Sequence, residues 1–189
     1  MPVRDYWVVA TLNSASERRP QLGSGADDAE FVRRAQLGSA AAFEQLVLHH
    51  GPALHRYLWM ELRHESDAHD ALQETLTAAW RGLPQLRDAE RFWPWLVGIA
   101  SNKAADVLRR RGRADATTVH TDLGVDDAGP SVEAREALAA LPPHFREILL
   151  LRYVLGLSEE ETAAALGVRV GTVKSRTARA RKALMESLA

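Results

Sequence analysis

The sequence predicts an all-α protein of two small helical domains joined by a flexible acidic linker, and three observations support this prediction. Apolar residues recur at helical spacing over residues 27–113 and again over residues 132–189. No stretch shows a convincing strand pattern of alternating apolar and polar residues. Residues 114–131 contain Gly124, Gly129, Pro130 and four aspartates without a lasting amphipathic period, so this segment is predicted to be the linker.

Residues 1–26 mix Ser, Pro, Gly and Arg without a sustained period, so we expect a flexible N-terminal extension. The chain has 189 residues, and its 46% of hydrophobic residues can fill the cores of two small domains. It contains no cysteine, which excludes disulfides and cysteine-ligated zinc. No apolar run approaches the roughly 20 residues needed to span a bilayer, and the N-terminus lacks a secretory pattern. We therefore expect a cytoplasmic protein.

The front domain, residues 27–113, is predicted to contain a helical break at Gly38 and helices over residues 67–81 and 92–111. One face of the 67–81 helix is expected to point towards the core: Ala71, Leu72, Leu76, Ala79 and Trp80. Another face carries hydrogen-bond acceptors spaced three and four residues apart: Asp67, Asp70, Gln73, Glu74 and Thr77. This acidic stripe suits a basic partner helix, but a merely solvated face explains the spacing equally well.

The loop over residues 83–91 and the helix after it form a second candidate surface. Phe92, Trp93 and Trp95 open that helix, and aromatics at this spacing are more often core residues than ligand platforms. The helix ends in a cluster of arginines over residues 109–113, which favours contact with phosphates. A basic helix end beside such a loop can also hold single-stranded DNA, with bases in pockets and arginines on phosphates.

The rear domain, residues 132–189, resumes as short helices that are broken at residues 141–143 and at Gly156. Ser158 and Glu161 form a capping box that opens a short helix, and Gly167 supplies the backbone freedom for a tight turn. A second helix from Val170 onward carries basic residues and no carboxylate up to Lys182. This arrangement matches a helix-turn-helix whose second helix enters the major groove of DNA. The alternative is a helical hairpin with a solvated basic face.

The net charge of -1 hides a strong segregation of charge along the chain. Residues 114–133 carry only acidic charges, whereas the helix from residue 170 to 182 carries only basic ones, so the local patch matters more than the total. Catalysis has little support. The histidines are scattered, with His49-His50 and the pair His64 and His69 the closest groups, and neither a metal-ligand spacing nor a phosphate loop appears. We therefore predict no enzyme, no catalytic residue, no metal and no cofactor.

Three stretches, in this order and spacing, resemble bacterial sigma factors of the extracytoplasmic-function group of the sigma-70 family. They are the Asp67-x-x-Asp70-x-x-Gln73-Glu74 helix, the segment FWPWLVGIASNKAADVLRRR, and the segment LPPHFREILLLRYVLGLSEEETAAALGVRVGTVKSR. The resemblance runs from about Asp28 to Leu188. It implies a sigma region 2 domain over residues 27–113 and a sigma region 4 helix-turn-helix domain over residues 132–189.

The resemblance also implies three sets of site residues. Core RNA polymerase is expected to bind through its beta-prime coiled coil and its beta flap, the former contacting Asp67, Asp70, Gln73 and Glu74. The minus-ten promoter element is expected to contact the 83–91 loop and its neighbours, with Arg87, Asp88, Asn102, Asp106, Arg109 and Arg110 as candidates. The minus-thirty-five element is expected to contact Thr172, Lys174, Ser175, Arg176, Arg179 and Lys182.

The implied function is therefore a sigma factor that brings core polymerase to promoter DNA and promotes strand opening. An anti-sigma factor is the expected regulator, and membrane contact is expected only through an anti-sigma factor that is itself membrane-bound. Two other classes remain open: a dimeric helix-turn-helix regulator that binds duplex DNA alone, and a sigma mimic that binds an anti-sigma factor without reading DNA. The basic helix and the arginine cluster argue against the mimic.

Overall fold

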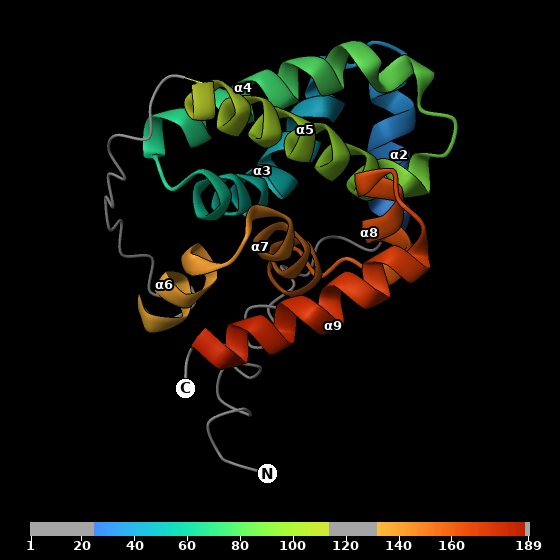
Figure 1. The fold of residues 1–189 in the computed structure, drawn as a ribbon. Coiled ribbons are helices and arrows are strands. Elements are labelled where there is room, and N and C mark those ends of the chain that lie inside the picture. Colours follow the sequence, from blue (N-terminus) through green and yellow to red (C-terminus); the bar gives the residue numbers. More distant parts are fainter. Residues whose placement is uncertain (1–24, 114–131, 188–189) are drawn as a thin grey trace. The chain divides into compact units, whose positions relative to one another are not determined.

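The computed structural model describes residues 25–113 and 132–187, and every regular element within those ranges is a helix (Figure 1). The prediction of an all-α protein is therefore confirmed for the described residues. The predicted linker and the predicted extension up to residue 24 lie outside them. Within the described ranges, no helix has an apolar stretch long enough to cross a bilayer.

The front domain contains four α-helices: α2 (Gly25–Gln36), α3 (Ala40–Leu62), α4 (Glu65–Gly82) and α5 (Phe92–Arg113). Helix α3 is central, because it packs against each of the other three. Its inward side chains are fully buried, among them Leu46, Leu54, Tyr57 and Leu58, and Leu96 and Val97 of α5 are buried as well. The short segments that join these helices therefore lie around a packed helical core.

Local capping explains where these helices begin and end. Gly38, between α2 and α3, has a φ of +91°, which glycine adopts without steric cost. The Ser39 hydroxyl accepts a hydrogen bond from the Ala42 backbone N–H at 3.3 Å and caps α3. His64 caps α4 in the same way, since its Nδ1 accepts from the Asp67 backbone N–H at 3.3 Å. The predicted break at Gly38 is confirmed, and the predicted helix over residues 67–81 begins slightly earlier, at Glu65.

The rear domain contains α6 (Val132–Ala140), α7 (Pro143–Leu149), a π-helical turn (Leu150–Val154), α8 (Glu159–Leu166) and α9 (Val170–Ser187). Helix α9 packs against α6 and α7. Proline at the first position of α7 suits a helix start, because that position needs no backbone donor. The predicted breaks at residues 141–143 and Gly156 are confirmed, whereas the π-helical turn between them was not predicted.

The capping box at the start of α8 is present as predicted. The Ser158 hydroxyl accepts from the Glu161 backbone N–H at 3.0 Å, and the Ser158 N–H donates to the Glu161 carboxylate at 2.7 Å. Gly167 follows α8 with a φ of +64°, so the predicted glycine turn is also present. Sequence reasoning therefore located both ends of α8 from local chemistry alone.

One predicted core residue of α4 is not in the core. Ala71 and Ala79 are buried as expected, but Trp80 is 38% exposed. Its ring lies against Phe43 of α3, with 5.0 Å between ring centroids. Trp80 therefore packs on a half-buried ring of α3 and not within the core.

Candidate functional site

The acidic stripe predicted on α4 lies on the side of the helix away from the core. Ala68, Ala71, Thr75 and Ala79 form the buried face. Asp70, Gln73 and Glu74 are exposed, and Asp67 is half-buried. The structure therefore brings all four predicted polymerase-binding residues onto one outward surface, named here the α4 acidic face.

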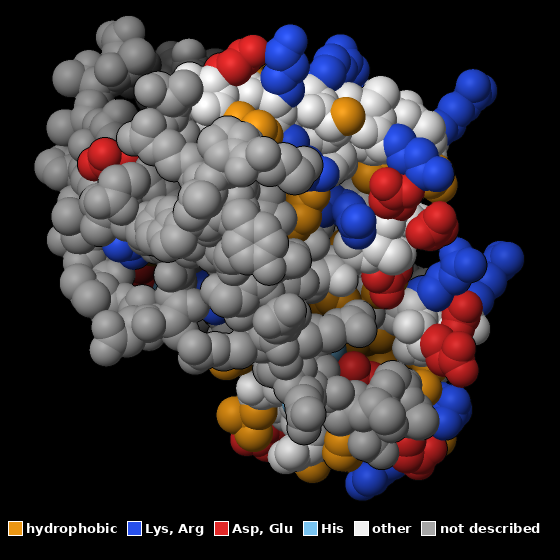
Figure 2. Space-filling model, turned by 90° about the horizontal axis from the view of Figure 1, so that it is seen from below, with side chains coloured by type: hydrophobic (Ala, Val, Ile, Leu, Met, Phe, Trp, Pro, Cys, Tyr) orange, Lys and Arg blue, Asp and Glu red, His pale blue; other side chains and the backbone are white. Residues whose placement is uncertain are grey.

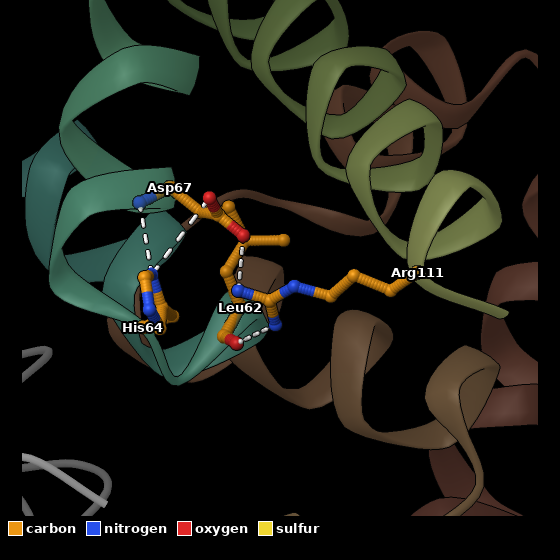
Figure 3. Close-up of polar contacts among 4 residues, drawn as sticks. All are labelled: Leu62, His64, Asp67 and Arg111. Carbon is orange, nitrogen blue, oxygen red and sulfur yellow. Dashed lines mark hydrogen bonds and ion pairs between the residues drawn. The ribbon is translucent and has the colours of Figure 1, made fainter. Parts of the chain in front are cut away.

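Asp67 is held by Arg111 of α5 and by His64, the N-cap residue of α4 (Figure 3). The Arg111 guanidinium of α5 pairs with the Asp67 carboxylate and donates a second hydrogen bond, of 2.7 Å, to the Leu62 carbonyl at the end of α3. His64 lies on the other side, with 3.7 Å between its Nδ1 and Oδ1 of Asp67. Arg111 therefore compensates the Asp67 charge and satisfies a helix-terminal carbonyl at the same time.

Glu74 has an intramolecular partner as well. The Lys103 Nζ of α5 lies 3.0 Å from Glu74 Oε2, with both side chains partly exposed. Among the described residues, Asp70 and Gln73 have neither an ion pair nor a side-chain hydrogen bond. Asp70 therefore carries the uncompensated charge of the α4 acidic face. Sequence reasoning missed Lys103 and Arg111, because they lie 29 and 44 residues from the carboxylates that they contact.

The predicted 83–91 loop is ordered as two 3-10 turns, Leu83–Gln85 and Ala89–Arg91. The Gln36 side chain of α2 anchors the first turn, because its Nε2 donates to the Leu83 carbonyl at 3.0 Å and to the Leu86 carbonyl at 2.7 Å. The Leu83 side chain is fully buried beneath the loop. Gln36 is a positioning residue that sequence reasoning missed, and no local pattern marks it.

The two predicted DNA contacts in this loop differ in their surroundings. Arg87 is exposed. Asp88 is also exposed, but its carboxylate accepts from the Glu90 backbone N–H at 3.1 Å and lies 3.3 Å from Arg91 Nε. Asp88 therefore has a local structural role as the cap of the second 3-10 turn. Arg87 lies on the bend between the two 3-10 turns, with its side chain exposed.

Helix α5 carries the other four predicted minus-ten residues on one face, because they recur three and four residues apart: Asn102, Asp106, Arg109 and Arg110. Asn102, Arg109 and Arg110 are exposed, and Arg109 forms an ion pair with Asp106. Arg111 points elsewhere, towards Asp67, so the arginines of the predicted phosphate-binding cluster do not all face the same side of α5. Phe92 and Trp93 are buried and Trp95 is half-buried, as the core interpretation of these aromatics requires.

Helix α9 divides cleanly into a buried face and an exposed face. The buried face consists of Val173, Thr177, Ala180 and Leu184. The exposed face includes four of the predicted minus-thirty-five residues: Lys174, Ser175, Arg179 and Lys182. The other two, Thr172 and Arg176, are half-buried at its edges. The structure thus places a row of basic and hydroxyl side chains along one accessible side of α9.

Contacts within the rear domain orient several of these side chains. Arg179 Nε donates to the Ser175 carbonyl at 3.2 Å, which directs the guanidinium along the helix towards its N-terminus. Lys174 Nζ lies 3.5 Å from Glu159 at the start of α8, and Lys182 Nζ lies 3.8 Å from Glu186. Both pairs are at least partly exposed and therefore weak. On the described part of the face in Figure 2, Lys and Arg side chains alternate with Asp and Glu side chains.

Comparisons with known proteins agree with this arrangement. A family model of Sigma-70 region 2 matches residues 46–114, and one of Sigma-70, region 4 matches residues 131–184. The RNA polymerase sigma factor CarQ of Myxococcus xanthus is 33% identical, over 83% of this chain and 95% of that protein. The ECF RNA polymerase sigma factor SigM of Mycobacterium tuberculosis is 35% identical, over 89% of this chain and 90% of that protein.

Two solved structures are similar over most of the chain. CnrH, in complex with the cytosolic domain of CnrY, is 33% identical with a TM-score of 0.70, covering 86% of this chain and 97% of CnrH. The sigma factor RpoE of Bartonella quintana, in complex with the anti-sigma factor NepR, is 30% identical with a TM-score of 0.69. That match covers 77% of this chain and 96% of RpoE.

Proposed function

We propose roles for these surfaces on the basis of the family of the chain. It belongs to the extracytoplasmic-function group of the sigma-70 family and acts as a sigma factor in transcription initiation. This family is not enzymatic. The polymerase therefore performs the nucleotidyl transfer, and the chain selects the promoter and helps to open it. The main support for the roles proposed for individual residues is the exposed basic face of α9. This helix comes after the capped helix α8 and a glycine turn, as in a helix-turn-helix.

The α4 acidic face binds core polymerase through a basic helical surface, which the family resemblance identifies as the beta-prime coiled coil. Asp70 and Gln73 make new contacts directly, since neither has a partner among the described residues. Asp67 and Glu74 are held by Arg111 and Lys103, so they present carboxylates whose positions are already fixed. Pre-positioned acceptors lose less side-chain entropy on binding than free ones.

The 83–91 loop and the outward face of α5 capture the non-template strand at the minus-ten element. Gln36 holds the loop in one conformation, and Arg87 lies on it where an extruded base or its phosphate is accessible. Asn102 offers an amide that donates and accepts at a base edge, while Arg109 and Arg110 neutralise nearby phosphates. Extruding a base costs a few kcal/mol, and these contacts offset that cost.

Helix α9 reads the minus-thirty-five element in the major groove. Lys174 and Ser175 lie near its N-terminal end, where recognition helices contact base edges, and Arg179 reaches back towards that end. Lys182 lies about two turns further along, where phosphate contact is expected. Thr172 and Arg176, at the edges of the face, contact the flanking backbone.

An anti-sigma factor is the proposed regulator of this chain. The Bartonella RpoE was solved with the anti-sigma factor NepR, and CnrH was solved with the cytosolic domain of CnrY; both are similar to this chain over most of its length. A protein that covers the α4 acidic face would exclude polymerase by direct competition. The site of action is then the cytoplasm, where core polymerase is found.

Reconstituted transcription tests the proposed function. Core polymerase is supplied with sheared genomic DNA, with or without the full chain, and the 5′ ends of the transcripts are sequenced. We expect new start sites that require both the chain and core polymerase and that share two upstream elements. A duplex-binding regulator would only repress or enhance existing starts, and a sigma mimic would produce none, so either result refutes the proposal.

A further inference from the structure

A cluster of metal-ligating side chains connects α2 to α3 in the front domain. It consists of Asp28 of α2 and the adjacent His49 and His50 of α3. His50 Nε2 lies 3.1 Å from Oδ2 of Asp28. One ligand atom from each of the three residues lies within 4.8 Å of the other two. This spacing is slightly wider than that of ligands around one bound ion, so small side-chain rotations close it.

Two imidazole nitrogens in this cluster are buried without a partner. His50 is fully buried, with its ring stacked on Trp93 at a centroid distance of 4.8 Å, and its Nδ1 has no hydrogen bond in the described structure. The Nε2 of His49 is likewise buried and unpaired. An ion that binds through His50 Nε2, beside Asp28, leaves Nδ1 unpaired, so the unpaired Nε2 of His49 is the nitrogen of this cluster that an ion or water would satisfy.

The donor chemistry indicates which ion fits. Two nitrogens and one carboxylate oxygen suit zinc and its neighbours, whereas Mg²⁺ and Ca²⁺ require mostly oxygen ligands.

We propose that Asp28, His49 and His50 bind a divalent first-row transition-metal ion, with Zn²⁺ as the reference ion and water as the fourth ligand. His49 and Asp28 are each partly exposed, so they give the ion a path from solvent and have room to move towards it. His50 is fixed by its stack on Trp93 and by the helix around it. The site therefore combines one rigid ligand with two adjustable ones.

A metal ion bound at this site would cross-link α2 and α3. Helix α2 also carries Gln36, whose side chain holds the 83–91 loop. Occupancy of the site therefore stabilises the helix that anchors the loop. The metal site itself does not depend on the function proposed for that loop, and it is tested separately.

A cobalt titration tests the site in the full-length chain after treatment with a chelator. Four-coordinate Co²⁺ absorbs visible light, so we expect absorption that saturates at one equivalent and is removed by Zn²⁺. His49→Gln and Asp28→Asn should each weaken binding by at least about tenfold. The matched control is His69→Gln, an exposed histidine on α4, which should bind cobalt as the wild type does.

Thermal melting provides a second readout that does not depend on cobalt spectroscopy. Metal-free wild type and His49→Gln should melt at similar temperatures, which shows that the variant folds, and Zn²⁺ should raise the melting temperature of the wild type alone. Absence of cobalt absorption by the wild type would overturn the proposal. So would equal cobalt affinity in His49→Gln, which would indicate an adventitious ion only, or loss of binding in His69→Gln.

Discussion

At the scale of single residues, Arg111 and its neighbour Arg110 have different surroundings although both belong to one basic run. Arg110 is exposed on the side of α5 that also carries Asn102 and Arg109, whereas Arg111 reaches the Asp67 carboxylate and the Leu62 carbonyl. A sequence pattern cannot separate them, because adjacent helical residues differ in direction and the partners of Arg111 lie far away in sequence. Because the two arginines have different contacts, their substitution by alanine should have different effects on stability and on promoter opening.

Arg111→Ala should lower the free energy of unfolding by about 1–2 kcal/mol, because it leaves the Leu62 carbonyl without its donor and removes a partly exposed ion pair. Arg110→Ala, the matched control, should change it by less than about 0.5 kcal/mol. Urea denaturation measures both values. In promoter-opening assays with saturating polymerase, Arg110→Ala should be more defective than Arg111→Ala. Equal stabilities of the two variants would show that Arg111 has no structural role.

Asp70 gives the sharpest test of the α4 acidic face, since it is the carboxylate with no compensating partner among the described residues. Asp70→Lys should weaken binding of core polymerase at least about tenfold, because it places like charges together at the interface. Glu44→Lys, an equal charge change on an exposed residue of α3, is the control and should bind normally. Glu74→Lys is less informative, since it would also repel Lys103 within the chain. Wild-type affinity of Asp70→Lys would remove α4 from the polymerase interface.

At the scale of elements, the sequence predicted best where the governing chemistry is local. The capping box of α8 and the Gly167 turn follow from neighbouring residues, and both are present. The expectation that Trp80 is a core residue was wrong, because helical spacing indicates direction but not how much room the opposing helix leaves. Gln36 could not be found at all, since its partners lie 47 and 50 residues away.

The anchoring of the 83–91 loop by α2 predicts a local effect of Gln36→Ala. The Leu86 carbonyl would lose its donor and the Leu83 carbonyl would keep only the Leu86 backbone N–H, which should destabilise the loop by about 1–2 kcal/mol. Backbone amides of residues 83–91 should then exchange hydrogen faster, and discrimination among minus-ten sequences should fall. Gln45→Ala, on an exposed position of α3, is the control. Unchanged exchange in the loop would show that Gln36 does not hold it.

The arrangement of α9 predicts that specificity and general affinity separate along the helix. Arg179→Ala should relax the preference within the minus-thirty-five element, since one base-edge contact contributes about 1–3 kcal/mol for the matching base pair only. Lys182→Ala should instead weaken all sequences alike and reduce the dependence on salt. A promoter-library selection at two salt concentrations distinguishes these outcomes. If Arg179→Ala retained the wild-type preference, Arg179 would be a backbone contact.

At the scale of the whole molecule, the segregation of charge suits a protein that joins unlike partners. A net charge of -1 coexists with an acidic face on α4 and a basic face on α9. Each DNA contact alone is expected to be weak. When core polymerase holds both domains, the second contact becomes intramolecular and its effective concentration rises. Promoter binding should therefore depend on polymerase, which the sequence resemblance implied and the surfaces of the separate domains support.

The most direct test of this account is a footprint of one mapped promoter with the chain alone, with core polymerase alone and with both, followed by permanganate probing of unpaired thymines. We predict protection of two separate upstream elements, and reactive thymines near the start site, only when both proteins are present. Protection of a single duplex site by the chain alone, unchanged by core polymerase and without melting, would contradict the account.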